Sequence, residues 1–301
     1  MTAARLAGVE LGGTKALVLL AEGDTIIERH RIETHGPADT LGAANAHLQH
    51  WNRAAPIEAV GIASFGPIML RQGDPLFGRI LPTPKPGWAG ADVHGTLMQG
   101  LDCPAAIDTD VNGAALAEYR WGAGQGVDCL WYITIGTGVG GGLLIDGRPF
   151  HGAMHSEIGH IRVKRQPRET FEGTCAFHGD CIEGLVSGPA LAARFGTAIE
   201  SVGDNHPRWR GVALDIAELV ATLFLTTAAQ RILLGGTVAL ERPFLLPRIR
   251  DAVVESLAGY LPFITQDTIA HRLCLAGLGN DAGPAGAIAL AQAALGRPAM
   301  Q

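Results

Sequence analysis

The sequence predicts an α/β fold of two lobes that face one shared phosphate group. The main observation is a repeated device, because a strand, a glycine/threonine turn and a second strand occur at residues 6–20 and again at 130–145. The two turns read Gly12-Gly13-Thr14 and Gly136-Thr137-Gly138. Glycine lets backbone N–H groups approach an anion without a Cβ in the way, so each turn suits a phosphate. An ordinary hairpin turn is the alternative for either copy taken alone.

The second observation is that strand and helix patterns alternate along the chain, which favours a mixed α/β fold. Strands are expected at 59–68 and 158–163, and a helix begins at Ser187 with Pro189 in its first turn. The Gly- and Pro-rich loop 74–88 ends at Trp88, which either lines a substrate mouth or anchors the loop. Further helices are expected at 40–51, 215–229, 243–261 and 285–294.

Composition narrows the class of protein. Of the 301 residues, 47% are hydrophobic, 17% are charged and 41 are glycine, which is typical of a compact globular enzyme. The net charge of −6 argues against nucleic acid or an anionic membrane as the main partner. No signal peptide is recognised at the start, and no apolar run approaches the ~18 residues that span a bilayer. Five cysteines, an odd number, fit a reducing cytoplasm, where we expect the protein to act.

Acidic and amide side chains gather where a short strand runs into a helix, within residues 103–122. Asp110 lies at the junction, and Asp is a favoured helix N-cap. That role is compatible with a carboxylate that also faces a cleft. Asp108 shares a face with Asp110 in an extended segment, and Asn112 follows two residues later.

A cysteine–histidine segment predicts a metal site. Cys175, His178 and Cys181 are spaced C-x2-H-x2-C, so two thiolates and an imidazole can converge on one tetrahedral ion. Zinc prefers four nitrogen or sulfur ligands, and His160 is the nearest candidate for the fourth. A chain of this length buries a core without a metal, so we expect a local structural role. Unlinked cysteines beside a loop histidine are the alternative.

Seven motifs follow one another along nearly the whole chain. They are Gly8-Val-Glu10-Leu-Gly-Gly-Thr-Lys15, Asp108-Thr-Asp110-Val-Asn112-Gly-Ala-Ala, Ile135-Gly-Thr-Gly-Val-Gly140, His155-Ser-Glu157-Ile-Gly-His160, Cys175-Ala-Phe-His178-Gly-Asp-Cys181-Ile-Glu-Gly, Gly235-Gly236 and Gly277-Leu-Gly-Asn-Asp-Ala-Gly283. In this order they resemble the ROK family of sugar kinases and repressors, within the actin-like/hexokinase ATPase superfamily. The metal motif with its histidine, and the loop at 82–88, look like the bacterial fructokinase branch.

The resemblance implies a two-lobed actin-like (ribonuclease H-like) ATPase fold, with a cleft between the lobes and a small zinc-bound loop. The N-terminal lobe would be residues 1–115 plus 285–301, with the first phosphate loop and the catalytic aspartate. The C-terminal lobe would be residues 116–284, with the second phosphate loop, the zinc loop and the adenosine site.

The resemblance also implies ATP-dependent phosphorylation of a hexose, first of all D-fructose to D-fructose 6-phosphate. Asp110 would take the proton from the attacking sugar hydroxyl, and Glu10 would hold Mg2+ through water. The sugar would be bound by Glu157, His160, Asn112 and Gly66. ATP would be contacted by Gly12, Gly13, Thr14, Lys15, Thr137, Gly138, Pro189, Gly235, Gly236, Thr237, Val238, Ala239 and Gly279.

A structural zinc would be held by His160, Cys175, His178 and Cys181. One nitrogen of His160 on the metal leaves the other for a sugar hydroxyl, so the zinc would brace the segment from Glu157 to His160.

Other functions remain open from the sequence. The same fold serves kinases for mannose, glucose or another hexose. Family repressors carry a helix-turn-helix domain before the first phosphate loop, whereas here the first strand begins near Leu6, so we do not expect a repressor. A sugar-binding protein without catalysis is disfavoured because Asp110, Glu10 and both glycine turns are present. The expected partners are a sugar and ATP, with a homodimer as the assembly that the resemblance suggests.

Overall fold

The computed structural model describes residues 3–167 and 169–296, and the chain divides into two compact units. Unit 1 comprises Met1–Arg120, Pro149–His155 and Asp281–Gln301, and unit 2 comprises Trp121–Arg148 and Ser156–Asn280. The chain therefore returns to unit 1 for one short segment between two parts of unit 2. The end of the lobe segment expected at 285–301, residues 297–301, lies outside the described residues, as do residues 1–2.

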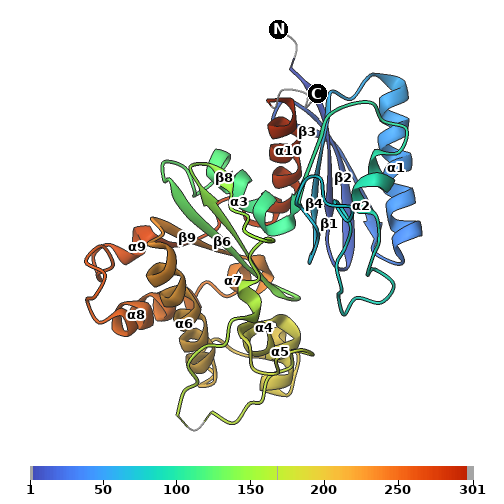
Figure 1. Ribbon diagram of the computed structural model, residues 1–301. Helices are drawn as coiled ribbons and strands as arrows, with labels where there is room; N and C mark the ends of the chain where they lie inside the picture. Colours follow the sequence, from blue (N-terminus) through green and yellow to red (C-terminus); the bar gives the residue numbers. More distant parts are fainter. Residues whose placement is uncertain (1–2, 168, 297–301) are drawn as a thin grey trace. The chain divides into compact units, whose positions relative to one another are not determined.

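Unit 1 is built on a five-stranded sheet in the order β3-β2-β1-β4-β5 (Figure 1). The first three strands form an antiparallel meander, β4 pairs parallel with β1, and β5 pairs parallel with β4. The strands are β1 (Arg5–Leu11), β2 (Lys15–Glu22), β3 (Thr25–Glu33), β4 (Ala59–Ser64) and β5 (Ala105–Thr109). The helices are α1 (Pro37–Ala54), α2 (Val93–Met98), α3 (Asp110–Trp121) and α10 (Ala282–Leu295).

Helices α1 and α10 cover opposite faces of this sheet (Figure 1). On one face, Leu41, Leu48 and Trp51 of α1 are buried in the core. On the other, α10 approaches so closely that a Cβ at Gly61 would lie 1.9 Å from the carbonyl oxygen of Ala287. A glycine in the middle of β4 is therefore required for the packing of α10.

Unit 2 repeats the same sheet topology in the order β10-β9-β6-β7-β8. Its strands are β6 (Cys129–Ile135), β7 (Val139–Ile145), β8 (Arg148–Pro149), β9 (Arg231–Gly235) and β10 (Leu273–Leu275). The hairpin β6–β7 corresponds to β1–β2, and β9 and β10 pair parallel beyond β6 as β4 and β5 pair beyond β1. The duplicated two-unit α/β fold that the repeated turns predict is confirmed.

The described helical segments of unit 2 are η1 (Ile158–His160), α4 (Ile182–Val186), α5 (Gly188–Phe195), η2 (Ile199–Ser201), α6 (Trp209–Thr227), α7 (Gly236–Glu241), α8 (Leu245–Leu257), α9 (Ile269–Arg272) and η3 (Gly279–Asp281). Of these, α5, α6 and α8 correspond to the helices predicted from Ser187, at 215–229 and at 243–261, and the sequence patterns did not predict the other, shorter segments. Ser187 caps α5, its hydroxyl accepting the N–H of Ala190 at 3.4 Å. The strand expected at 158–163 is wrong, because the chain turns at η1, where Gly159 packs against the Val139 backbone too closely for a Cβ.

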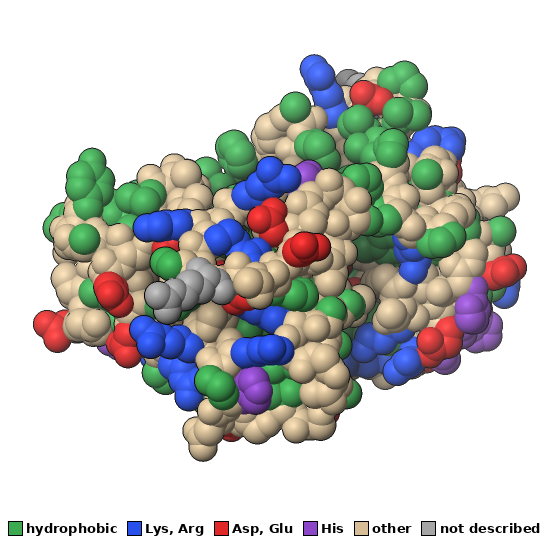
Figure 2. Space-filling model, turned by 90° about the horizontal axis from the view of Figure 1, so that it is seen from below, with side chains coloured by type: hydrophobic (Ala, Val, Ile, Leu, Met, Phe, Trp, Pro, Cys, Tyr) green, Lys and Arg blue, Asp and Glu red, His purple; other side chains and the backbone are tan. Residues whose placement is uncertain are grey.

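The surface carries charges of both signs. Figure 2 shows Lys and Arg side chains interspersed with Asp and Glu across the face in view. No helix within the described ranges 3–167 and 169–296 is long and apolar enough to cross a membrane.

Candidate functional site

The first glycine turn, between β1 and β2, is held through its carbonyl groups. Gly12 N–H donates to Lys15 O at 3.0 Å, and Thr34 donates from its hydroxyl to Gly12 O and from its N–H to Thr14 O, each at 3.0 Å. Nothing lies within 4 Å of the place where a Cβ of Gly13 would stand. The turn is therefore fixed from one side and open above Gly13, as a phosphate-binding tip requires.

Two carboxylates of unit 1 have raised pKa values. Asp110 is the first residue of α3, directly after β5, and its Oδ1 accepts the N–H of Val111 at 2.9 Å. Burial raises the pKa of Asp110 to about 6. Burial, and then the charge of Asp110, raise the pKa of Glu10 on β1 to about 7. Carboxyl groups shifted toward neutrality in this way are typical of acid–base and cation-binding sites.

The surroundings of Glu10 fit a divalent cation. Its Oε2 is buried and has no hydrogen-bond partner within the described part of the chain. Magnesium takes carboxylate oxygens directly or through water, and a cation here would compensate the burial that raises the pKa. Gly283 of α10 makes room for this carboxylate, because a Cβ there would lie 2.0 Å from Glu10 Oε1.

A polar cluster surrounds Asp108, and His151 is the member that the sequence patterns missed. Asp108 is 4% exposed, and its Oδ1 accepts the Thr109 N–H at 2.8 Å and the Asn112 side-chain amide at 2.7 Å. His151 approaches the same carboxylate at 3.1 Å. Asn112, a predicted sugar ligand, is thus 2% exposed and bonded to Asp108. The sequence spacing pointed to Asp108 and Asn112, but no local pattern links them to His151, which lies 43 residues from Asp108 in the chain.

The other predicted sugar residues fall in both units. In unit 1, Gly66 packs against the His155 ring, and Nε2 of His155 accepts the Ile68 N–H at 3.1 Å. In unit 2, Glu157 is exposed immediately before η1, and His160 closes that turn. Only one residue therefore separates buried His155 from exposed Glu157 along the chain.

The four predicted zinc ligands come together in unit 2. Ligand atoms of His160, Cys175, His178 and Cys181 all lie within 4.8 Å of one another. Nδ1 of His160 is 3.8 Å from Cys175 Sγ and 3.6 Å from Cys181 Sγ, and Nδ1 of His178 is 3.8 Å from Cys175 Sγ. Tetrahedral zinc, with Zn–S near 2.3 Å and Zn–N near 2.1 Å, separates sulfur and nitrogen ligands by roughly 3.6 Å. The donor set and its spacing fit zinc.

The metal loop is shaped by its backbone. Cys175 and Gly179 exchange backbone hydrogen bonds of 3.1 and 2.9 Å, and Gly179 adopts φ +65°. Gly184 packs so tightly that a Cβ would lie 2.0 Å from Gly179 O. Burial raises the pKa of the Cys181 thiol to about 11, so a metal has to displace that proton when it binds.

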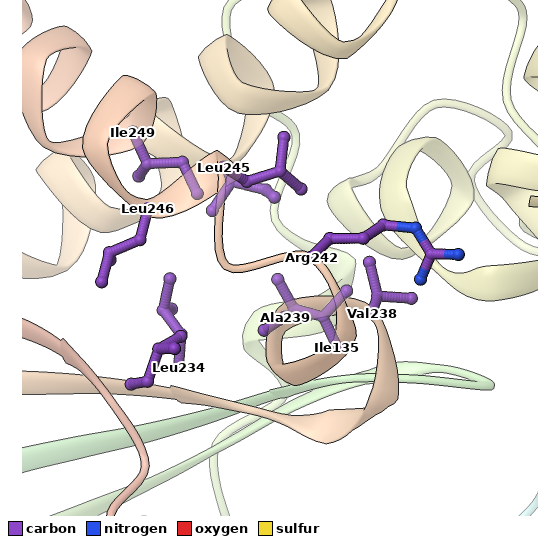
Figure 3. A pocket seen from close by; sticks show the side chains of 10 residues that line it. Ile135, Leu234, Val238, Ala239, Arg242, Leu245, Leu246 and Ile249 are labelled. Carbon is purple, nitrogen blue, oxygen red and sulfur yellow. The ribbon is translucent and has the colours of Figure 1, made fainter. Parts of the chain in front are cut away.

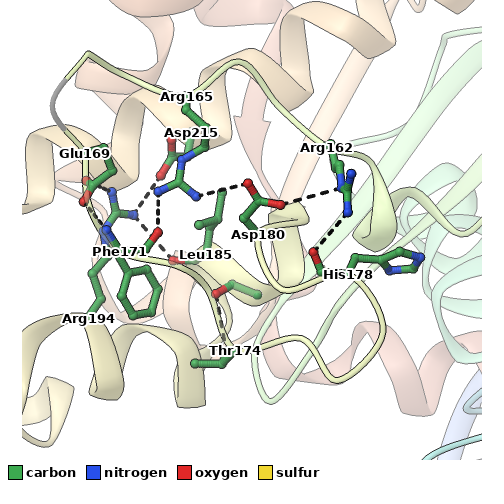
Figure 4. A network of polar contacts seen from close by, with 11 residues as sticks. Arg162, Arg165, Glu169, Phe171, Thr174, His178, Asp180, Leu185, Arg194 and Asp215 are labelled. Carbon is green, nitrogen blue, oxygen red and sulfur yellow. Dashed lines mark hydrogen bonds and ion pairs between the residues drawn. The ribbon is translucent and has the colours of Figure 1, made fainter.

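An ion network that is buried at Arg194 and Asp215 extends to the partly exposed Asp180 in the metal loop (Figure 4). Arg194 of α5 is 4% exposed and pairs with Asp215 of α6 at 2.7 Å and with Glu169 at 2.6 Å. Arg165 approaches Asp180, which lies between the ligands His178 and Cys181, at 3.9 Å. The network thus joins the chain before the metal loop to helices α5 and α6.

The second glycine turn, between β6 and β7, contacts the helices that follow the metal loop. Glu183 of α4 accepts the Val139 N–H at 3.0 Å, and a Cβ at Gly138 would lie 2.7 Å from the same oxygen. Gly188 N–H donates to Gly136 O at 2.7 Å, which brings the start of α5, with exposed Pro189, beside the turn. Thr137 is exposed at the tip.

The segment from Gly235 to Ala239, which was predicted to contact ATP, runs into the start of a helix. Gly236 adopts φ +80° and begins α7, with its missing side chain against the Ile135 backbone. Thr237 is exposed, whereas Val238 and Ala239 are buried and line a small apolar pocket with Leu245 and Ile249 (Figure 3). Gly279, with φ +55°, lies at the start of η3.

Comparison with known proteins agrees with this architecture. The sequence profile described as "ROK family" matches residues 6–294. A fructokinase of Zymomonas mobilis subsp. mobilis is 39% identical over 295 residues, covering 95% of this chain and 96% of that protein. A fructokinase of Pediococcus pentosaceus is 38% identical over 291 residues, covering 96% and 98%.

A solved structure of a ROK family protein is also similar to this chain. The ROK family glucokinase of Streptomyces griseus, in complex with glucose and AMPPNP, superposes with a TM-score of 0.73 at 26% identity, covering 96% of this chain and 99% of that one. The two five-stranded sheets have the actin-like fold of these proteins. By sequence profile, full-length relatives and fold, this chain belongs to the ROK family.

Proposed function

We propose that this protein is an ATP-dependent hexose kinase with Asp110 as its general base. The observation that carries the proposal is the pair Glu10 and Asp110, two carboxylates with raised pKa values in the unit that also presents the open turn at Gly13. Phosphoryl transfer needs alignment and charge neutralisation more than covalent help from the protein. A base and a cation ligand beside a phosphate-binding turn supply these requirements.

In the proposed reaction the sugar hydroxyl oxygen forms a bond to the γ-phosphorus of ATP. The bond between that phosphorus and the bridging oxygen breaks, ADP leaves, and the hydroxyl proton passes to the Asp110 carboxylate. Mg2+ held near Glu10 would neutralise phosphate charge when bound. In this proposal the phosphates would be oriented by the turns at Gly13 and Thr137 with Lys15, and the adenosine would be flanked by Pro189, Thr237 and Gly279. Asn112 supports Asp108 and so fixes the start of α3.

D-fructose is the proposed substrate, with D-fructose 6-phosphate as the product. The two relatives reported above, at 38–39% identity over nearly their whole length, are named fructokinases. His160 would take part in binding the sugar: with its Nδ1 among the cysteine sulfurs as a zinc ligand, its Nε2 would be left for a sugar hydroxyl. Glu157, three residues earlier, would accept hydrogen bonds from neighbouring hydroxyls.

Another hexose is the second candidate, since the solved relative from Streptomyces griseus holds glucose. An ADP-release assay with Mg-ATP and a panel of fructose, glucose, mannose and allose distinguishes the two. We expect the highest kcat/KM with fructose. A higher value for glucose or mannose would overturn the substrate assignment but keep the kinase, whereas no release with any hexose would overturn the function itself.

A further inference from the structure

Lys85 places a positive charge at the first glycine turn. It belongs to the loop that ends at Trp88, which is fully buried and donates from its indole Nε1 to His35 O at 2.9 Å. Trp88 therefore anchors the loop rather than lining a substrate mouth. From this anchored loop, Nζ of Lys85 reaches across unit 1 and donates to the carbonyl oxygen of Gly13.

Aromatic rings hold the Lys85 ammonium in place. Its Nζ lies 5.5 Å from the ring centroid of Phe65 and 6.0 Å from that of Trp88, and these two rings pack edge to face at 5.0 Å. Such rings attract a cation through their π-faces but do not neutralise it. Partial burial lowers the pKa of Lys85 from its ordinary value.

No carboxylate in the described residues pairs with Lys85 within 4.0 Å, so its charge is uncompensated in this structure. An ammonium has three donors, and the Gly13 carbonyl uses one. Two donors remain for a ligand above the turn, where the space over Gly13 is open. The site thus combines a fixed cation, a glycine turn and room for an anion.

We propose that Lys85 binds the terminal phosphate of ATP and stabilises the charge on the phosphoryl group during transfer. This inference rests on the proposed kinase function and adds a residue that the family motifs quoted above do not assign. Lys85 keeps its proton and forms no covalent bond, and the hydroxyl proton still goes to Asp110. Its contribution is electrostatic, from a donor that is already in place before the nucleotide binds.

The alternative is that Lys85 only latches its loop to the Gly13 carbonyl. These two roles differ in one measurable respect. If Lys85 binds phosphate, its removal lowers the affinity for a nucleotide with a terminal phosphate more than the affinity for ADP, whereas a residue that only holds its loop makes no such difference. Lys85→Met removes the charge and keeps a long apolar stem over Phe65 and Trp88. Lys85→Arg keeps the charge. Lys164→Met is a matched control, because Lys164 is exposed in unit 2.

The experiment measures the affinity of each variant for ADP and for a non-hydrolysable ATP analogue by calorimetry with Mg2+, together with kcat and thermal midpoint. We expect Lys85→Met to lower the affinity for the ATP analogue at least about 10-fold and the affinity for ADP less than about 3-fold. The same variant should lower kcat by about 10- to 100-fold. Lys85→Arg should recover part of kcat, and Lys164→Met should match the wild type.

If Lys85→Met lowered the affinities for ADP and the ATP analogue equally, the phosphate role would be overturned. A lower thermal midpoint with an unchanged ratio of the two affinities would overturn it too, and Lys85 would then only hold its loop to the Gly13 carbonyl. An active wild type whose Lys85→Met variant has the same kcat would overturn this inference alone. A wild type that phosphorylates no hexose would overturn the proposed function and this inference with it.

Discussion

The variant Gly283→Ala tests whether the position of the Glu10 carboxylate matters for catalysis. Gly283 is the second residue of α10, and a Cβ built there lies 2.0 Å from Glu10 Oε1. Ordinary van der Waals contact begins at 3.4 Å, so the oxygen has to move by about 1.4 Å (3.4 − 2.0). This oxygen is at the free end of a side chain, so we expect the carboxylate to rotate away while the helix stays in place.

The expected result of Gly283→Ala is a loss of activity without a loss of stability. A misplacement of about 1 Å can cost about 10²-fold in rate, so we expect a fall of that size in kcat/KM for the hexose. The Mg2+ concentration that gives half-maximal rate should rise, because Glu10 is the proposed ligand. The free energy of unfolding should change by less than about 1 kcal/mol, because alanine's preference for the helix offsets the rearrangement.

The assay is ADP release at varied Mg2+ with thermal unfolding measured in parallel. Gly42→Ala is the matched control, since Gly42 lies inside α1 with nothing within 4 Å of a new Cβ. It should gain about 0.5–1 kcal/mol of stability and keep wild-type kinetics. Wild-type kcat/KM and Mg2+ dependence in Gly283→Ala would refute the reasoning that the placement of Glu10 supports catalysis.

Three further predictions follow from the same structure. Cys175→Ser should lower the zinc content measured by atomic absorption and raise KM for fructose more than KM for ATP. An unchanged fructose KM in a folded, zinc-free variant would contradict the proposal that zinc braces the segment from Glu157 to His160. The value of kcat/KM should rise with pH through about 6, because Asp110 must be ionised to accept a proton, and a flat profile from pH 5 to 7 would argue against it. Arg194→Met should lower the free energy of unfolding, measured in urea, by about 3–5 kcal/mol because it leaves the buried Asp215 unpaired. Adding Asp215→Leu should recover part of this loss. Equal stability of Arg194→Met and the wild type would contradict that account.

The sign of the stability effect at Asp110 follows from its raised pKa. The folded state holds this proton more tightly than the unfolded chain, so stability falls as pH rises from 3.8 toward 6. Asp110→Asn removes the buried charge, so its thermal midpoint should exceed that of the wild type at pH 8. The advantage should disappear at about pH 4, where both forms are neutral.

Sequence patterns predicted the features that depend on local spacing. The ligands Cys175, His178 and Cys181 lie within one short loop, so their convergence follows from the spacing alone. The glycine turns and the position of Asp110 at a strand end follow likewise from adjacent residues. The repeated turn also predicted a duplicated fold, and the structure adds that the two sheets have matching strand orders with the hairpin at the same place in each.

The contacts that could not be predicted join residues distant in the sequence. Lys85 meets Gly13, and Gly283 meets Glu10, only because the sheet of unit 1 brings their segments together. The error at 158–163 has a different cause, because Ile158, Ile161 and Val163 suggest a strand. There Gly159 packs against the Val139 backbone, and the turn it permits delivers His160 to the metal cluster. Packing overrides local propensity at that point.

The most direct test of the central claim compares fructose-dependent ADP release by the wild type and by Asp110→Asn at pH 8 with Mg-ATP. Loss of a general base typically costs about 10²- to 10⁴-fold, so we expect a fall in kcat of that size. Affinity for fructose and ATP should be unchanged, and the thermal midpoint should not fall. An Asp110→Asn variant that keeps its turnover would contradict the assignment of Asp110 as the base.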